Sequence, residues 1–113
     1  MNKYEKLLSP LKIKNTVFKN RIGASPTTPF FYTNEHTRPS EEFIEHVVSK
    51  ARGGCGVVTI SGVSTAPIEK NEEPVGHMDM FSFFSMRDIM RMVDRVHHYG
   101  AKLSVELMSM NFE

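Results

Sequence analysis

The chain has 113 residues, of which 40% are hydrophobic and 24% charged, values typical of one folded domain and not of a disordered segment. Its 14 Lys and Arg against 13 Asp and Glu give a net charge of +1 with no basic cluster, which argues against a nucleic acid or an anionic membrane as partner. The single cysteine, Cys55, excludes an internal disulfide and points to a reducing compartment. The charged stretch from Met1 to Lys6 does not resemble a secretory signal, and no apolar run is long enough to cross a membrane. We therefore expect a cytoplasmic α/β domain.

The first predicted elements are a small β-hairpin and a short strand. Residues 11–19 place apolar side chains on both sides of Asn15, as a hairpin does. Residues 22–25 form an apolar run that ends at Pro26, because proline cannot donate to a strand ladder. The polar, proline-rich stretch 26–39 predicts a long loop.

A helix is predicted between a cap at Ser40 and a stop at Gly53, and it completes a first strand–helix unit over residues 21–53. Glu41 and Glu42 lie in its first turn, where negative charges are stabilised by the positive end of the helix dipole. The apolar positions recur at helical spacing. They are Phe43, Ile44, Val47, Val48 and Ala51.

A second strand–helix unit is predicted over residues 56–100. Its strand, 56–61, is rich in β-branched residues, as expected of a strand covered on both faces. Residues 62–84 predict another long loop, after which Ser85 and Asp88 have the spacing of a capping box. The apolar positions of the following helix are Ile89, Met90, Val93 and Val96.

The last predicted element is a third strand over residues 103–108, with Leu103, Val105 and Leu107 on one face and Glu106 on the other. Strands that alternate with helices predict a parallel sheet with right-handed crossovers. Both long loops follow strands, and in (β/α) barrels the loops at the carboxyl ends of the strands form the catalytic face.

Several motifs occur together in a fixed order. S-P-L-x-I lies at residues 9–13, K-N-R-I at 19–22 and R-G-G-x-G at 52–56, with further matching segments at 25–28 and 62–67. Their order and spacing resemble the old yellow enzyme family, the NADH:flavin oxidoreductases that include ene-reductases and the barrel domain of 2,4-dienoyl-CoA reductases. The resemblance implies the N-terminal part of an FMN-binding TIM (β/α)8 barrel. The chain would supply about three of the eight βα units, preceded by a hairpin, and so an incomplete barrel.

The resemblance also implies cofactor-binding residues at the ends of the first two strands. Ser25, Pro26, Thr27 and Thr28 match a turn that lies against the flavin, with Thr27 standing where the family commonly has an apolar residue. A hydroxyl at Thr28 could donate to the flavin C4 oxygen and tune the potential. Gly62 matches a small residue that lets the ring approach closely. Without the resemblance, the two threonines would merely end a strand and the glycine would mark a turn.

Glu106 departs from the family pattern. The family commonly has Gln at this position of the third strand, followed by a histidine and a glycine, where this chain has Ser109 and Asn111. A carboxylate that faces a barrel interior is costly unless it is protonated or paired, and it would repel an anionic reduced flavin. The other interpretation is a strand end that frays into solvent.

No metal site is predicted. His97 and His98 are adjacent on a helix and cannot both face one metal ion, and the other histidines lack ligand spacing. Cys55 is predicted to be a small buried residue in the glycine turn and not a nucleophile. The methionines, including Met86, Met90 and Met92, are interpreted as packing residues.

The expected function is that of an FMN-dependent oxidoreductase. The full-length enzyme would take hydride from NAD(P)H onto the flavin and pass it to an enone or enoyl substrate. The family's catalytic residues and phosphate-binding loops have no counterpart in this sequence, so no catalytic residue is assigned. We expect a truncated N-terminal portion that is inactive alone.

Two alternatives remain at this point. The chain could be a non-catalytic remnant or interaction module that forms a homo-oligomer through open sheet edges. A weaker alternative is an unrelated small α/β domain whose resemblance to the family is coincidental.

Overall fold

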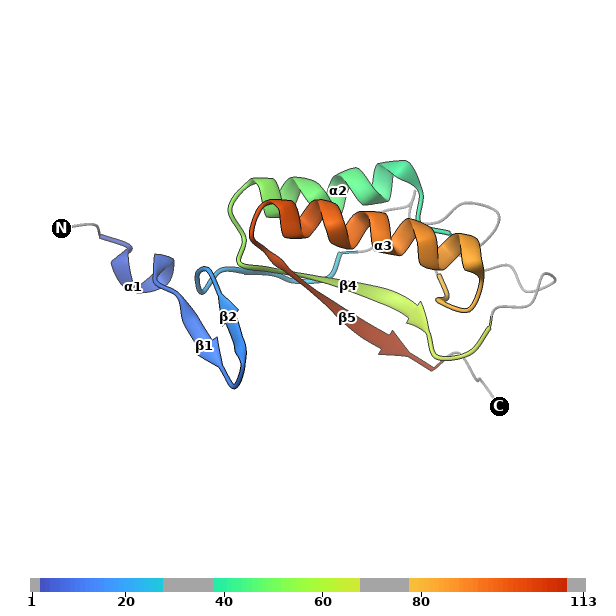
Figure 1. The fold of residues 1–113 in the computed structure, drawn as a ribbon, viewed down its shortest axis with the longest axis horizontal. Coiled ribbons are helices and arrows are strands. Elements are labelled where there is room, and N and C mark those ends of the chain that lie inside the picture. The colour runs from blue at the N-terminus through green and yellow to red at the C-terminus, as the bar shows by residue number, and fades with distance from the viewer. Residues whose placement is uncertain (1–2, 28–37, 68–77, 110–113) are drawn as a thin grey trace.

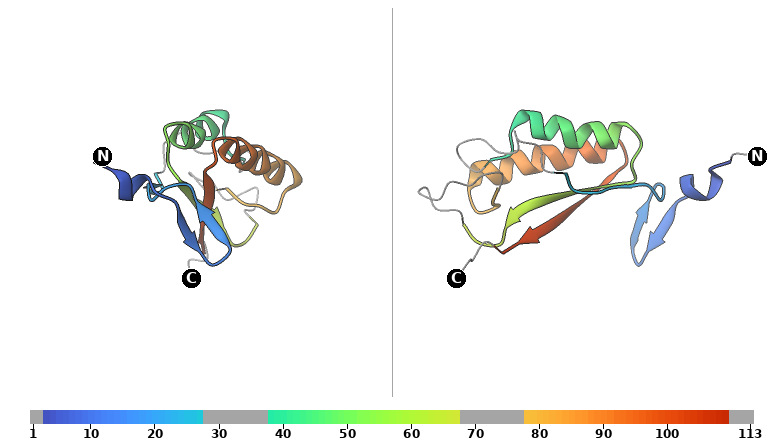
Figure 2. Two further views of the ribbon diagram at one scale, coloured as in Figure 1. Left: turned by 60° about the vertical axis from the view of Figure 1, so that its left-hand side comes forward. Right: turned by 180° about the vertical axis from the view of Figure 1, so that it is seen from behind.

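The computed structural model describes residues 3–27, 38–67 and 78–109. Two helices lie on one face of a three-stranded parallel sheet, and a two-stranded hairpin extends from one end of it (Figure 1). The view from behind shows both helices on the same side of the sheet (Figure 2). In chain order the elements are α1 (Glu5–Leu8), β1 (Leu11–Ile13), β2 (Thr16–Phe18), β3 (Gly23–Ala24), α2 (Glu41–Arg52), β4 (Val57–Ser64), α3 (Phe83–His98) and β5 (Lys102–Met108).

The predicted hairpin and the parallel sheet are both present. Strands β1 and β2 pair antiparallel with Leu11 opposite Phe18, and Lys14 in the turn between them has a φ of 51°. Positive φ values are typical of the tight turns that match strand twist. The sheet has the order β3-β4-β5 and both of its pairings are parallel. The short helix α1 was not predicted.

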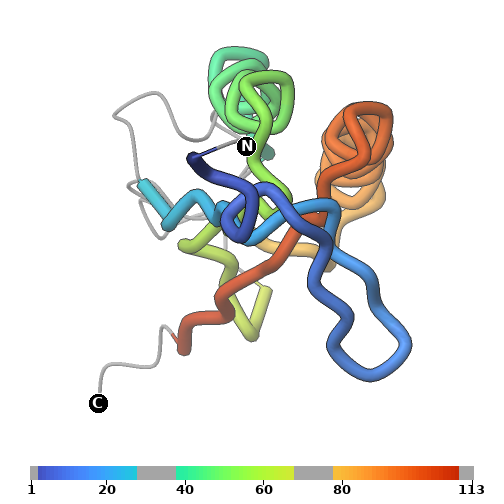
Figure 3. The backbone as a smooth tube through the Cα atoms, turned by 90° about the vertical axis from the view of Figure 1, so that its left-hand side faces the viewer, coloured from blue at the N-terminus to red at the C-terminus, as the bar shows by residue number. Residues whose placement is uncertain are grey.

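The predicted helix between Ser40 and Gly53 is confirmed as α2. The Ser40 side chain accepts a hydrogen bond of 3.0 Å from the Phe43 backbone N–H, which satisfies one of the free donors at the start of the helix. All five residues of the predicted apolar stripe are buried. Viewed from the end that carries the hairpin, α2 and α3 lie side by side on the same side of the sheet (Figure 3).

Helix α3 begins earlier than predicted, and the capping-box interpretation is wrong. The cap is Ser82, whose side chain accepts from the Ser85 backbone N–H at 3.0 Å. Ser85 and Asp88 lie inside the helix and are buried. Ser82 and Ser85 are three residues apart, and either could cap a helix at this point. The burial of Ser85 inside the helix leaves Ser82 as the cap. Met90 is 59% exposed and therefore does not belong to the buried face, on which Met92 lies instead.

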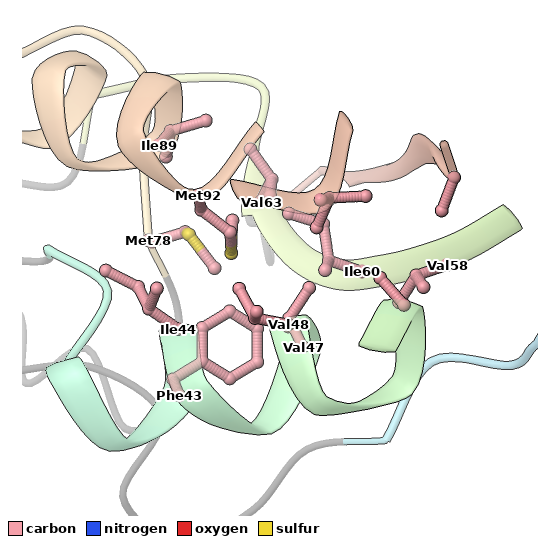
Figure 4. Packing of buried hydrophobic residues seen from close by; sticks show 13 residues of the cluster. Phe43, Ile44, Val47, Val48, Val58, Ile60, Val63, Met78, Ile89 and Met92 are labelled. Atoms are coloured by element: carbon pink, nitrogen blue, oxygen red, sulfur yellow. The ribbon is translucent and has the colours of Figure 1, made fainter. Parts of the chain in front are cut away.

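The core lies between the two helices and one face of the sheet (Figure 4). Each fully buried large apolar side chain contributes about 1.5–3 kcal/mol relative to exposure. The opposite face is less covered, since Val57 and Thr59 are only partly buried. Among the described residues, β4 is thus covered on one face only, whereas the sequence had predicted a strand covered on both faces. The buried residues are Phe43, Ile44, Val47, Val48, Ala51, Val58, Ile60, Val63, Met78, Ile89, Met92, Val96 and Ala101.

Strand β4 contains a bulge. Ile60 pairs with Val105 and Val63 with Leu107, so two residues of β4 stand opposite one residue of β5. One of the two is Gly62, whose φ of 76° lies in the left-handed region that favours glycine. The strand therefore continues beyond its predicted end at residue 61, and the following loop is shorter than predicted.

Asn20 of the K-N-R-I motif joins the start of the sheet to the glycine turn. Its amide donates to the Gly54 carbonyl at 2.7 Å and accepts from the Ile22 N–H at 3.0 Å. A Cβ at Gly56 would lie 2.5 Å from the Asn20 side-chain oxygen, so only glycine fits this close approach. The two family motifs thus contact each other directly.

The residues on either side of Asn20 hold two further elements. Lys19 Nζ donates at 2.6 Å to the carbonyl of Tyr99, the residue that caps the end of α3, where a cation is favoured by the helix dipole. The Arg21 N–H donates to the Leu7 carbonyl at 2.9 Å, and its guanidinium donates to Ser9 Oγ at 3.3 Å. The motif therefore connects α3 and the N-terminal segment to the amino end of the sheet.

We predict that Asn20→Ala lowers the free energy of unfolding by about 1–3 kcal/mol, because two partly buried backbone groups lose their partner. Asn20→Asp is the matched variant: it keeps an acceptor for the Ile22 N–H and places a second oxygen against the Gly54 carbonyl. At neutral pH, Asn20→Asp should lower the free energy of unfolding at least as much as Asn20→Ala does. Urea unfolding followed by circular dichroism measures both, and values within about 0.5 kcal/mol of wild type would contradict the assignment.

A charged contact also crosses between α3 and the residues before α2. The guanidinium of Arg38 lies 2.6 Å from Asp88 Oδ2, and the Asp88 side chain is only 4% exposed. Arg91, one turn further along α3, contributes a further contact to Asp88 at 3.4 Å and a contact to Glu41 at 2.8 Å. Asp88 therefore joins segments that are 50 residues apart in the sequence.

We predict that Asp88→Asn lowers the free energy of unfolding by about 1–3 kcal/mol, since the buried end of a charge-assisted hydrogen bond is lost. Asp94→Asn is the control because Asp94 lies exposed on the same helix, and its effect should stay within about 0.5 kcal/mol. Equal effects of the two substitutions in urea unfolding would show that the Arg38 contact contributes nothing.

Candidate functional site

The predicted site residues gather at one end of the sheet. The strands run parallel, so their carboxyl ends point the same way, as the arrowheads of β4 and β5 show (Figure 1). Residues 25–27 follow β3, Gly62 lies in the bulge of β4, and Glu106 lies near the end of β5. Thr28, the remaining predicted residue, lies outside the described residues.

Glu106 lies on the sheet face opposite the helices. Leu103 and Val105 pack against the core, and the alternation of side chains along a strand directs Glu106 to the other side. Its carboxylate accepts a hydrogen bond of 3.1 Å from Ser61 Oγ. Strand β5 continues to Met108, so Glu106 belongs to the ladder while its side chain is exposed.

Ser61 is a candidate site residue that the sequence reasoning missed. Its hydroxyl lies 3.1 Å from Glu106 Oε1 and 3.6 Å from Met108 Sδ, so it contacts two side chains of β5. It precedes Gly62 in the bulge, and bulges re-aim side chains near active sites. The alternation after the buried Ile60 could have indicated that Ser61 faces away from the helices.

Gly62 combines a special backbone conformation with burial. It is buried, has a φ of 76°, and its carbonyl accepts from the Met78 N–H at 3.0 Å. In addition, the Ser64 N–H donates a hydrogen bond of 2.8 Å to the Met78 carbonyl. The carbonyl of Gly62 is therefore engaged with the segment that precedes α3, and the glycine is more than an isolated turn residue.

Thr27 directs its side chain toward α2. Its Oγ1 lies 2.9 Å from His46 Nε2 and accepts a hydrogen bond of 2.9 Å from Lys50 Nζ. Partial burial, and then the positive charge of Lys50, lower the pKa of His46 below its ordinary value of 6.5. The sequence reasoning missed His46 and Lys50 as partners, although their spacing of four residues places them on one face of a helix.

The described residues hold no cluster of three or more His, Cys, Asp and Glu side chains suited to a metal ion. Cys55 is partly buried and packs against the core, as expected of a small structural residue. Within the same residues, no helix has the length and apolar character needed to span a bilayer.

Comparison with known proteins identifies the family. The sequence profile of the NADH:flavin oxidoreductase / NADH oxidase family matches residues 6–112. The chain belongs to this family. The alternative of an unrelated α/β domain with a coincidental resemblance is therefore wrong.

Two relatives show how much of a full-length family protein the chain covers. The chain is 30% identical over 107 residues to an NADPH dehydrogenase of Listeria monocytogenes serotype 4a (strain HCC23), covering 90% of this chain and 30% of the relative. It is 30% identical over 113 residues to a cinnamate reductase of Clostridium sporogenes (strain ATCC 7955 / DSM 767 / NBRC 16411 / NCIMB 8053 / NCTC 8594 / PA 3679), covering 94% of this chain and 16% of that enzyme. The chain thus spans less than a third of the length of these relatives.

The fold agrees with the family. The structure of the old yellow enzyme from Trypanosoma cruzi superposes with a TM-score of 0.77 at 21% identity, covering 96% of this chain and 28% of that chain. Old yellow enzymes are (β/α)8 barrels, and the predicted fold class is confirmed. The described residues form an open three-stranded sheet and a separate hairpin, not a closed barrel.

We predict that lowering the pH through 6.5 destabilises the fold in a way that depends on His46. Its pKa is lowered in the folded state, so the unfolded chain binds more protons below pH 6.5. The stabilisation is therefore present above that pH and is lost as the pH falls through the folded-state pKa. Urea unfolding across this range should show a weaker pH dependence for His46→Gln than for wild type. His97→Gln, at an exposed position of α3, is the control and should retain the wild-type slope.

Proposed function

We propose that this chain forms part of the flavin-binding face of an FMN-dependent oxidoreductase that uses NAD(P)H to reduce an activated alkene of the enone or enoyl class. The observation that supports the proposal is the position of residues 25–27, Gly62 and Glu106 at the carboxyl end of one parallel sheet. Barrels of this class place their active sites at that end. The names of relatives, an NADPH dehydrogenase and a cinnamate reductase among them, support the reaction class.

The polar groups at this end suit the edge of a flavin ring. Ser61 offers a hydroxyl that can donate or accept, and an ionised Glu106 is an acceptor that can receive a hydrogen bond from a ring N–H. The backbone of residues 25–27 would lie against the ring, and the glycine bulge would allow close approach. FMN, when bound, supplies the chemistry of hydride transfer. The role of these residues is to bind and orient the ring, and none of them is assigned a catalytic role.

The charge of Glu106 sets the expected affinity. An ionised carboxylate can accept from a ring N–H but cannot donate to the ring carbonyl oxygens, whereas the amide of Gln does both. A negative charge beside the ring also disfavours any gain of negative charge there. Ser61 compensates in part by donating a hydrogen bond to the carboxylate. FMN binding should therefore be weaker than with Gln at this position.

We predict that Glu106→Gln tightens FMN binding about five- to tenfold, the equivalent of one neutral hydrogen bond gained. The measurement is a fluorescence titration of the purified chain with FMN. Glu5→Gln removes the same charge in α1, remote in the chain from the sheet, and should leave the dissociation constant unchanged. An unchanged affinity of Glu106→Gln would remove Glu106 from the site, and a weaker affinity would contradict the argument that its charge disfavours the flavin.

A second candidate function is an interaction module that assembles through the sheet. Among the described residues β5 pairs with β4 on one side only. Leu107 on β5 is 61% exposed, and Ile13 and Val17 of the hairpin are 54% and 52% exposed. Unpaired strand edges with exposed apolar side chains favour association with a second chain.

The visible absorption spectrum, taken together with the mass from size-exclusion chromatography, distinguishes the two candidates. A folded chain that elutes with flavin absorption bands supports the oxidoreductase proposal. A colourless oligomer that also fails to bind added FMN contradicts it and supports the interaction module. A colourless monomer without FMN affinity would argue against both.

A further inference from the structure

The segment after β3 leaves the sheet early. Strand β3 ends at Ala24, opposite Val58, whereas β4 continues to Ser64. The residues that follow Ala24 therefore reach the site without the ladder hydrogen bonds that hold β4 and β5 together at the same level. Other contacts are needed to fix the backbone of this turn, because a free segment would have to lose conformational entropy on ligand binding.

Those contacts come from α2. Thr27 Oγ1 lies 2.9 Å from His46 Nε2 and 2.9 Å from Lys50 Nζ, so one hydroxyl is held by two side chains of the same helix. Val47 and Val48, which lie between the two partners, are buried in the core. The contact therefore ties the turn to a helix whose inner face is buried in the core.

The chemistry of the groups fixes the direction of one of the two hydrogen bonds. A lysine ammonium group can only donate, so Thr27 accepts from Lys50. The hydroxyl also has a hydrogen to donate and a second lone pair, so the tautomer of His46 sets the direction of the bond to Nε2. In either direction the hydroxyl is held by both side chains of α2.

The hydroxyl of Thr27 is what makes both contacts with α2. An apolar side chain at residue 27 could form neither of these hydrogen bonds. The contact between the turn and α2 therefore depends on the hydroxyl of Thr27 together with His46 and Lys50.

We infer that His46 and Lys50 are positioning residues that, through the hydroxyl of Thr27, hold the turn after β3 in the conformation that receives the flavin. The inference rests on the proposed function for the identity of the ligand. The anchoring of the turn by α2 is independent of it and can be measured without FMN.

The central test is Thr27→Val, which keeps the shape of the side chain and removes both hydrogen bonds. Thr27→Ser keeps the hydroxyl and is the conservative rescue, and Lys50→Met removes one donor while leaving Thr27 in place. Thr16→Val, in β2 of the hairpin, is the control for a threonine substitution elsewhere. All variants are made in the full chain, and urea unfolding confirms that each is folded.

Two measurements are made on each variant. The first is amide hydrogen exchange of Ser25 and Thr27 by NMR without ligand, which should be about fivefold faster in Thr27→Val and in Lys50→Met. The second is the dissociation constant for FMN, expected to rise about fivefold, the equivalent of roughly one lost hydrogen bond. Thr27→Ser and Thr16→Val should match wild type in both.

Each outcome decides a different part of the inference. Unchanged exchange in Thr27→Val overturns the anchoring role of α2. Faster exchange together with unchanged FMN affinity overturns the link between the anchor and the flavin. If wild type binds no FMN while exchange still accelerates, the proposed function fails and the anchoring role stands.

Discussion

The structure depends on a core that lies on one face of the sheet. Helix α2 packs against β4, α3 packs against α2 and β5, and the fully buried apolar residues lie in this layer. Because the hydrophobic effect is proportional to the apolar area removed from water, this layer supplies most of the stabilisation. It also fixes the direction of the three parallel strands, and so decides which side chains of β4 and β5 turn away from the helices toward the candidate site.

The two ends of the sheet have different roles. The K-N-R-I and R-G-G-x-G motifs lie at the amino end, where Asn20 contacts Gly54 and Lys19 contacts Tyr99. Those contacts hold elements together and involve none of the proposed flavin-binding residues. The carboxyl end carries Ser61 and Glu106 on a more exposed surface. Barrels commonly separate stability and chemistry in this way, with function confined to the carboxyl face.

Two polar side chains among the candidate site residues each have a hydrogen-bond partner on a neighbouring element. Glu106 receives a hydrogen bond from Ser61 across the bulge, and Thr27 is held by His46 and Lys50. In both cases a polar side chain that would otherwise need water gains a specific contact. Such contacts matter at a binding site because an unpaired polar group next to a ligand is costly.

Local patterns of turn residues, caps and apolar spacing were enough to predict the hairpin, helix α2 and the parallel strands, and the motifs were enough to predict the family. The tertiary structure was needed to show which serine caps α3, how far β4 continues, and that Asp88 pairs with Arg38. It also decided that the hydroxyl of Thr27 turns toward α2 while Glu106 turns away from the helices. These features join residues that are distant in the chain, and no local pattern encodes such a contact. Their energy comes from packing and hydrogen bonds that exist only once the sheet and helices have come together.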